Sequence, residues 1–287
     1  MVRRALFGLA VVAAAVFHAG VQAAEQPIRL YVLDGGVLES DPGRYRLKPE
    51  EVQTTQLSIA SFLIVHPKGT LMWDTGAISD ETWTPGRRPQ ARHLVLSNNA
   101  DRYVTLAKSL TGQLKEIGYQ PTDITYLALS HYHWDHVANA NAFAKSTWLV
   151  RKVERDAMFP QPAAEPPQPS NFAALMNAKT TLITTDDYDV FGDGTVVIKA
   201  STGHTPGHSV LYVKLAKTGG VVLAGDLYHY PEERTLNRLP TADFDQAQTG
   251  RSREVLDGFL KQTSSQLWIQ HDLVAHRKLK KAPAYYD

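Results

Sequence analysis

The chain has 287 residues, with 30 Lys and Arg against 29 Asp and Glu, 11 His and no Cys. The lack of Cys excludes disulfide scaffolds, iron–sulfur clusters, cysteine-based zinc sites and cysteine nucleophiles, so any metal site must use nitrogen and oxygen ligands. A formal charge of +1 provides no positive surface of the kind that binds nucleic acid. We therefore expect an ordinary globular protein with no nucleic-acid partner.

The N-terminus has the layout of a secretory signal peptide. Arg3 and Arg4 precede an apolar run over residues 5–16, and small residues follow up to Ala23 and Ala24. We predict a signal peptide over residues 1–23 and a mature domain over residues 24–287 without a membrane span. We also expect a secreted or periplasmic location. An uncleaved anchor or a buried first helix is the alternative.

Apolar periodicity predicts a single domain in which strands and helices alternate. Helical spacing predicts helices over residues 103–117 and 251–260. A hairpin turn is expected from His66 to Gly69. Grouped strands with helices between them favour two sheets with helices packed outside. The predicted strands are residues 28–33, 57–65, 71–74, 124–129, 147–150, 196–200, 210–215 and 221–224.

Two long segments interrupt this pattern. Residues 77–99 contain Trp83, and residues 159–171 contain five of the sixteen Pro. Loops of this length are usually covers over a site or disordered insertions, and both interpretations stay open. The basic residues 277–281 are expected to be a solvated surface rather than a docking site.

Candidate catalytic chemistry is concentrated directly after the predicted strand 124–129. His131, His133, Asp135 and His136 lie within six residues. Four such side chains are costly to bury together unless a cation compensates them. In an extended backbone, residues two apart face the same way, so His131 and His133 can converge on one ion. Asp135 and His136 are then placed for a second ion.

Further candidate ligands follow other predicted strands. His204 lies in a Gly-containing turn after strand 196–200, Asp226 closes the apolar run 221–224, and His271 follows residues 267–270. Glycines in the first of these turns allow the backbone to approach an ion closely. Taken alone, Asp226 is better explained as a turn residue than as a ligand.

Together, these motifs resemble the metallo-β-lactamase superfamily and, within it, the N-acyl-homoserine lactonases. The resemblance implies an α/β fold built as a four-layer αββα sandwich, with metals at one edge between the sheets. It rests on five motifs in order along the chain: Trp73-Asp74-Thr75-Gly76, His131-Tyr132-His133-Trp134-Asp135-His136, the His204 turn, Gly225-Asp226 and Gln270-His271-Asp272.

The resemblance also implies two divalent metal ions. Zinc suits nitrogen and oxygen ligands, and iron, manganese or cobalt would also fit. Asp74 would orient a ligand imidazole through its second nitrogen, and His208 would be a structural hydrogen-bonding residue. The implied ligands are His131, His133 and His204 for one ion, Asp135, His136 and His271 for the other, and Asp226 as the bridge between them.

The implied reaction is ring opening of N-acyl-homoserine lactones, which is the reaction of quorum quenching. A hydroxide bridging the two ions would attack the lactone carbonyl, and Asp135 would deliver a proton to the leaving alkoxide. One position departs from the family pattern, because His229 stands where these lactonases have a substrate-contacting tyrosine, with Tyr228 and Tyr230 on either side. Tyr228 and His229 are therefore candidate substrate contacts, and simple packing of this loop is the alternative.

Other activities of the superfamily stay open, namely hydrolysis of a phosphotriester, an aryl ester or a thioester. A β-lactamase is disfavoured because Asp226 is unusual there and because some subclasses need a cysteine ligand. A glutathione thioesterase normally continues into a helical C-terminal domain, whereas only 16 residues follow His271. An exported lactone-binding protein without activity is the remaining alternative, and the complete ligand set argues against it.

Overall fold

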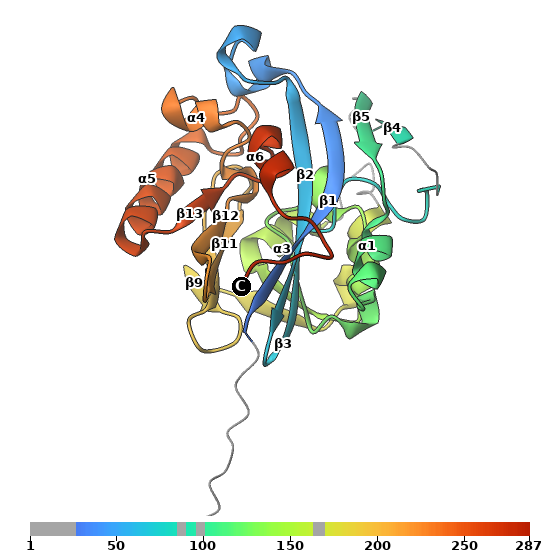
Figure 1. Ribbon diagram of the computed structural model, residues 1–287. Helices are drawn as coiled ribbons and strands as arrows, with labels where there is room; N and C mark the ends of the chain where they lie inside the picture. Colours follow the sequence, from blue (N-terminus) through green and yellow to red (C-terminus); the bar gives the residue numbers. More distant parts are fainter. Residues whose placement is uncertain (1–26, 85–89, 96–100, 163–169) are drawn as a thin grey trace, which may run out of the picture.

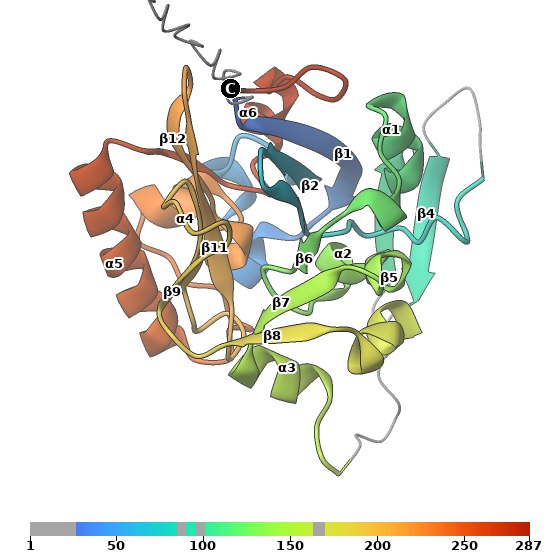
Figure 2. The same cartoon turned by 90° about the horizontal axis from the view of Figure 1, so that it is seen from below.

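Two β-sheets lie face to face, and helices cover the outer face of each (Figures 1 and 2). The structure is a computed structural model that describes residues 27–84, 90–95, 101–162 and 170–287. This arrangement confirms the expected α/β sandwich with αββα layers in a single domain. The predicted signal peptide, residues 1–23, lies outside the described residues.

The first sheet has eight strands in mixed orientation. Strands β1, β2 and β3 are antiparallel neighbours, whereas β3, β6, β7 and β8 run parallel. His66 pairs with Gly69 at the turn between β2 and β3, as the predicted hairpin requires. Across the sheet the order is β4 (Gln90–Val95), β5 (Asp101–Leu106), β1 (Arg29–Glu39), β2 (Gln56–His66), β3 (Gly69–Trp73), β6 (Tyr126–Ala128), β7 (Thr147–Arg151) and β8 (Thr180–Ile183).

The second sheet has five strands. Its neighbours are antiparallel except for β12 and β13, which run parallel, as the crossover through α5 between them allows. The order is β13 (Gln266–Trp268), β12 (Gly219–Leu223), β11 (Ser209–Leu215), β10 (Val196–Ala200) and β9 (Asp187–Asp189).

Helices are short apart from α5, which contains the predicted helix 251–260. The α-helices are α1 (Leu110–Glu116), α2 (Trp134–Val137), α3 (Lys152–Met158), α4 (Pro231–Thr235), α5 (Gln246–Thr263) and α6 (Leu273–Lys278). The 3-10 helices are η1 (Pro42–Tyr45), η2 (Pro49–Glu51), η3 (Pro121–Asp123), η4 (Ala140–Phe143), η5 (Ser170–Asn177) and η6 (Gly225–Leu227).

The alternation of side chains along β1 shows how one strand serves two core layers. Leu30 and Val32 belong to the core between the two sheets. Tyr31 and Leu33 face the other way and join Leu114 of α1 in the core beneath the outer helices. Because successive side chains of a strand point to opposite faces, a continuous apolar run here indicates burial on both faces. Helix α5 covers the second sheet in the same manner (Figure 1).

One predicted helix is partly wrong. Residues 103–117 divide into the end of strand β5 and helix α1. Val104 and Leu106 are buried and alternate with exposed residues, and β5 pairs with Leu38 of β1. Ser109 then starts the helix, because its hydroxyl accepts a hydrogen bond from the Gly112 N–H. Strand β5 ends at Leu106 and helix α1 begins at Leu110, so these two leucines have helical spacing although they belong to different elements.

The long segments expected to be covers are described only in part. Residues 90–95 form strand β4, and Trp83 packs against the cluster that contains Tyr45 and Tyr230. Residues 85–89, 96–100 and 163–169 lie outside the described residues. At the other end of the chain, Arg277 and Lys280 are exposed, as expected of a solvated surface. None of the helices described has the length and apolar character needed to cross a membrane.

Candidate functional site

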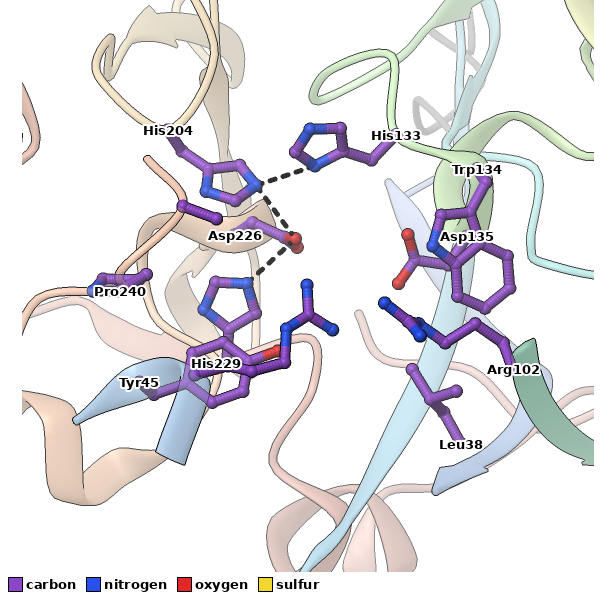
Figure 3. A pocket seen from close by; sticks show the side chains of 12 residues that line it. Leu38, Tyr45, Arg102, His133, Trp134, Asp135, His204, Asp226, His229 and Pro240 are labelled. Atoms are coloured by element: carbon purple, nitrogen blue, oxygen red, sulfur yellow. Dashed lines mark hydrogen bonds and ion pairs between the residues drawn. The ribbon is translucent and has the colours of Figure 1, made fainter. Parts of the chain in front are cut away.

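The seven predicted ligands meet at one edge of the sandwich, where strands of both sheets end. Figure 3 shows four of them around a pocket. Each comes from a segment that directly follows a strand, or from the short helix α2 next to it. His131 and His133 follow β6, Asp135 and His136 lie on α2, His204 lies between β10 and β11, Asp226 lies in η6 after β12, and His271 follows β13.

These side chains form two groups that share one carboxylate. Candidate ligand atoms of His131, His133, His204 and Asp226 all lie within 4.8 Å of one another, and so do those of Asp135, His136 and His271. The Oδ2 atom of Asp226 lies 3.5 Å from His131 Nε2 and 3.3 Å from His204 Nε2. The Oδ1 atom lies 3.0 Å from His136 Nε2 and 2.9 Å from His271 Nε2. Asp226 therefore faces both groups, one with each oxygen.

Hydrogen bonds on the far side of the rings fix the tautomer of three imidazoles. In each ring Nδ1 lies next to an oxygen that can only accept, so Nδ1 carries the hydrogen and Nε2 keeps a lone pair that points inward. These oxygens are Asp74 Oδ2 for His136 (2.9 Å), Asp243 Oδ1 for His204 (2.8 Å) and the Ser58 carbonyl for His271 (2.7 Å).

The other two imidazoles complete the first group. His131 Nδ1 lies 3.0 Å from the hydroxyl of Ser130, which itself donates to Asp74 at 2.9 Å, so His131 also turns a free Nε2 inward. His133 is reversed and places Nδ1 2.9 Å from His204 Nε2. Two lone-pair nitrogens at this distance need a proton or a metal ion between them.

The inward-facing atoms suit a pair of cations. Among the described residues, Nε2 of His131, His136 and His271 and Oδ1 of Asp226 are buried and form no hydrogen bond. Each such atom costs about 1–3 kcal/mol when it has no partner. Burial holds the pKa of His131 well below its ordinary value, which keeps that ring neutral, as a ligand must be. For Asp226 burial opposes ionisation, but the facing imidazoles hold its pKa well below the ordinary value. This donor set therefore fits divalent ions of the zinc type.

Asp74 is the centre of the network behind the site. One of its oxygens accepts from the Ser130 N–H at 2.6 Å, and the other accepts from Gln270 Nε2 at 2.8 Å as well as from His136. Its backbone has a φ of 59°, in the left-handed region that costs a non-glycine residue conformational energy. The structure thus confirms the expectation that Asp74 orients a candidate ligand imidazole.

His208 is a structural residue, as expected. Its Nδ1 donates to the Ser201 carbonyl at 2.8 Å, and its Nε2 accepts from the Asp226 N–H at 3.0 Å. Burial lowers the pKa of His208 to about 3, so the ring is neutral and can accept this bond. His208 therefore positions the backbone of Asp226 rather than contributing to either group.

A cavity of about 260 Å³ opens onto the site (Figure 3). Its wall combines residues of the first group and Asp135 with apolar side chains and two arginines. No described residue of the segments 77–99 and 159–171 lines it. The lining residues are Leu38, Arg44, Tyr45, Arg102, His133, Trp134, Asp135, His204, Asp226, His229, Pro240 and Ala242.

A family model described as the metallo-β-lactamase superfamily matches residues 54–265, which is more than half of the chain. The chain belongs to the metallo-β-lactamase superfamily. All seven predicted ligands except His271 lie inside the matched range.

Curated relatives within this superfamily carry the name N-acyl homoserine lactonase. AttM from Azorhizobium caulinodans is 28% identical over 271 residues, which cover 91% of this chain and 99% of the relative. A lactonase from a Bacillus species is 27% identical over 263 residues, which cover 90% of this chain and 98% of the relative. The resemblance inferred from the motifs is thereby confirmed.

Solved structures of the superfamily share the fold over nearly the whole chain. A mutant of AiiA from Bacillus thuringiensis, with N-decanoyl-L-homoserine bound at its active site, has a TM-score of 0.74 at 22% identity and covers 90% of this chain and 98% of its own. AidC, a dizinc quorum-quenching lactonase in complex with a product, has a TM-score of 0.64 at 18% identity, with coverage of 92% and 95%.

Tyr228, His229 and Tyr230 follow Asp226, and of these three only His229 lines the pocket. Its Nε2 lies 3.1 Å from Asp226 Oδ2. Tyr228 is 1% exposed and packs beneath α5, where the guanidinium of Arg253 lies 4.1 Å from its ring centre. The structure does not bring the candidate contact Tyr228 to the pocket, because its ring is packed in the cluster with Leu256 and Leu260. Tyr230 packs in the cluster around Leu38.

Tyr45 is a pocket residue that sequence reasoning missed. The centre of its ring lies 4.3 Å from the ring centre of His229. From its position in η1, Tyr45 lines the cavity. Burial raises the pKa of Tyr45, so that its phenol stays protonated. No motif marks it, because η1 reaches the site only through the folded arrangement of distant segments. The same holds for Asp243, which lies 39 residues after His204 in the chain.

Glu154 on α3 connects the two loops that carry the first group. Its carboxylate accepts hydrogen bonds from the Tyr132 N–H (3.0 Å), the Thr205 hydroxyl (2.8 Å) and the Gly207 N–H (2.7 Å). The side chain is 2% exposed, and this burial raises its pKa to about 7 despite the three bonds. Glu154 therefore holds the loop of His131 and His133 against the loop of His204.

Proposed function

We propose that this protein is a metal-dependent lactonase that opens the ring of N-acyl-homoserine lactones. The observation that carries the proposal is Asp226, whose two oxygens face two separate groups of imidazoles at the floor of a pocket. Relatives named as lactonases align over about nine-tenths of the chain, which supports this choice among the reactions of the superfamily.

Two divalent ions bound by these residues would supply an activated water and polarise the carbonyl of the substrate. Addition of water to the lactone carbonyl breaks the ring C–O bond and yields a hydroxy acid. The leaving alkoxide needs a proton. Asp135 belongs to the set formed with His136 and His271, and its carboxyl group also lines the pocket. We assign this proton transfer to Asp135.

Two further residues of the pocket would orient the lactone. His229 presents its ring to the pocket with Nε2 3.1 Å from Asp226 Oδ2, so an N–H at this atom would be shared between that oxygen and the carbonyl of a bound lactone. The ring of Tyr45 packs against His229 at a tilt of 40° and limits the position of that ring. In this proposal, His229 takes the role that we had expected of a residue in the Tyr228–Tyr230 segment.

A pH-release assay on zinc-loaded protein tests the proposal. Acid release is measured with N-hexanoyl-homoserine lactone, a simple γ-lactone, an aryl ester, a phosphotriester, a glutathione thioester and a cephalosporin. We expect the acyl-homoserine lactone to have the highest kcat/KM. A higher value for another class would assign the site to that reaction. Binding of the lactone without acid release would identify a lactone-binding protein.

We also propose that residues 1–23 direct export of the protein. Two arginines, an apolar run and a small-residue site support this proposal. The mass of the protein recovered from the periplasm or medium of an expressing bacterium tests it. We expect the mass of a chain that begins at Ala24, and recovery of the full-length chain from the cytoplasm would contradict export.

A further inference from the structure

Two arginines line the pocket in addition to the residues assigned above. Arg44 lies in η1, and Arg102 lies on β5, two segments that are far apart in the chain. Figure 3 shows the side chain of Arg102 directed into the pocket beside Asp135, across from Tyr45. Both arginines thus line the space in which a substrate of the metal site would lie.

The backbone of each arginine is held in place. The carbonyl of Arg44 accepts from both the N–H (2.8 Å) and the hydroxyl (3.0 Å) of Thr241. Asp41 caps this segment by accepting from the Gly43 N–H at 2.9 Å. Arg102 belongs to a strand that pairs with both β4 and β1. The two cations are therefore presented by ordered segments rather than by a free surface loop.

Within the described ranges, neither guanidinium forms an ion pair with a carboxylate. The one hydrogen bond of the Arg102 side chain runs from Nη1 to the backbone carbonyl of Asp101 at 2.8 Å. Other arginines of the fold are paired, as Arg253 is with Glu233 at 2.6 Å. Partial burial lowers the pKa of Arg102, and the charge of Arg44 acts in the same direction, whereas Tyr45 and Asp135 act against them.

We propose that Arg44 and Arg102 bind an anionic group of the substrate, so that the preferred lactones carry a carboxylate on their acyl chain. This inference rests on the proposed lactonase function. Guanidinium groups bind carboxylates through paired, charge-assisted hydrogen bonds. A neutral acyl chain in the same place would cover two charged groups without compensating them. Leu38 and Trp134, which line the same cavity, are suited to the methylene groups between the amide and the carboxylate.

Matched pairs of lactones test this inference. N-glutaryl- and N-pentanoyl-homoserine lactone have acyl chains of equal length and differ in a terminal carboxylate or methyl group. We expect zinc-loaded wild-type protein to have a kcat/KM at least about tenfold higher for the glutaryl compound, mainly through a lower KM. The same comparison with N-succinyl and N-adipoyl lactones locates the carboxylate. Raising the salt concentration from 50 to 500 mM should reduce the preference.

Variants assign the preference to the two arginines. Arg44→Met and Arg102→Met replace the guanidinium by a shorter, unbranched and uncharged side chain, and each should bring the ratio of the two kcat/KM values towards one. Arg46→Met is the matched control, because it removes an equal charge only two residues from Arg44. The side chain of Arg46 binds Gln246 and does not line the pocket. The control should keep the ratio of the wild type.

The outcomes separate this inference from the proposed function. A ratio of the two kcat/KM values near one in the wild type overturns the inference. This holds even if inorganic phosphate competes with the neutral lactone, because the arginines would then bind free anions but not the substrate. An equal loss of the ratio in Arg46→Met also overturns it, in favour of a general effect of charge. If neither lactone is opened, the lactonase proposal fails. Calorimetric binding of N-glutaryl-homoserine, at least about tenfold weaker to Arg102→Met, then decides on the subsite alone.

Discussion

Asp226 shows how one side chain can organise a two-ion site. Its oxygens lie 2.9–3.5 Å from five imidazole nitrogens, those of the four facing candidate ligands and that of His229, while its backbone N–H is held by His208. A carboxylate is suited to this position because it has two equivalent acceptor atoms, whereas an imidazole can direct only one lone pair inward. At the scale of single residues, the site is therefore built around a bridge rather than around a single ion.

Asp135→Asn tests the proposed proton transfer. We expect a fall in kcat for the lactone by about 100-fold or more, because an amide cannot deliver a proton to the leaving alkoxide. Zinc content is measured on the same sample, so that loss of a ligand is distinguished from loss of an acid. Asp156→Asn on the exposed face of α3 is the control, since that carboxylate pairs only with Lys152. A near-normal kcat for Asp135→Asn would remove Asp135 from this role.

Residues of the candidate site differ in how far the sequence predicts them. All seven predicted ligands come together, because each follows a buried strand and strand ends meet at one edge of a sandwich. The pocket wall could not be predicted in the same way. Arg44, Tyr45 and Arg102 stand in segments without a motif. Sequence also does not show which way a ring turns, so it could not decide between pocket and packing for Tyr228, which packs beneath α5.

Helix α3 supports the site through one buried carboxyl group, and this gives the stability a pH dependence. The pKa of Glu154 is raised from 4.5 to about 7 in the folded protein. Between these values the folded state keeps the proton that the unfolded state has released, so this contribution is present below pH 4.5 and is lost as the pH rises to 7. The change amounts to roughly 3 kcal/mol.

Glu154→Gln isolates this contribution, because glutamine is neutral at every pH. Urea unfolding of zinc-saturated protein is measured at pH 5 and pH 8 for both proteins. Relative to the variant, the wild type should lose stability between the two pH values, by up to about 3 kcal/mol. Equal pH dependence in the two proteins would show that Glu154 is ionised throughout. Other titrating groups are common to both and cancel in the comparison.

Helices α4 and α5 are joined by two ion pairs of different burial, which allows a direct comparison. Glu233 and Arg253 are buried and 2.6 Å apart, whereas Arg234 and Asp257 are 43% and 46% exposed at 2.7 Å. Glu233→Gln leaves the guanidinium of Arg253 buried without its counter-charge, and should lower the free energy of unfolding by about 3 kcal/mol or more.

Asp257→Asn is the matched change in the exposed pair and should cost less than about 1 kcal/mol, because water screens both charges. Urea unfolding at one pH measures both variants. A similar small loss in each would mean that the charge of Arg253 is satisfied by its bonds to the carbonyls of Leu227 and Arg238.

At the same scale, local pattern predicts most strands and fails at β5, a strand with one buried face. The strands of both sheet centres are found within a few residues, since long apolar runs have one interpretation when both faces are buried. Strand β5 was taken for the start of a helix, because Leu106 and Leu110 are four residues apart. Strand β5, next to the edge strand β4, has only one buried face, and its short alternation competes poorly with a helical spacing that extends over more residues.

For the whole molecule, bound metal should be part of its stability. The site buries three imidazole nitrogens and one carboxylate oxygen that lack hydrogen-bond partners among the described residues. Dialysis against a chelator should lower the midpoint of thermal unfolding, and zinc should restore it. At a free zinc concentration one thousand times the Kd, each bound ion adds about 4 kcal/mol to the free energy of unfolding. Calorimetry and metal analysis measure both effects. An unchanged midpoint with two ions bound would contradict the assignment of these residues as the ligands.

The last residues of the chain have a consequence for self-association. Tyr286 exchanges both backbone hydrogen bonds with Leu30 of β1 (2.8 and 2.9 Å), and the Ala282 N–H donates to the Val32 carbonyl at 3.0 Å (Figure 1). Strand β5 pairs with β1 only at Val37 and Leu38, so these residues cover the backbone that β5 leaves open. An uncovered strand of this kind is a template for pairing with another chain. Deletion of residues 282–287 should therefore produce dimers or larger aggregates in light scattering, at concentrations at which the intact chain keeps its own oligomeric state.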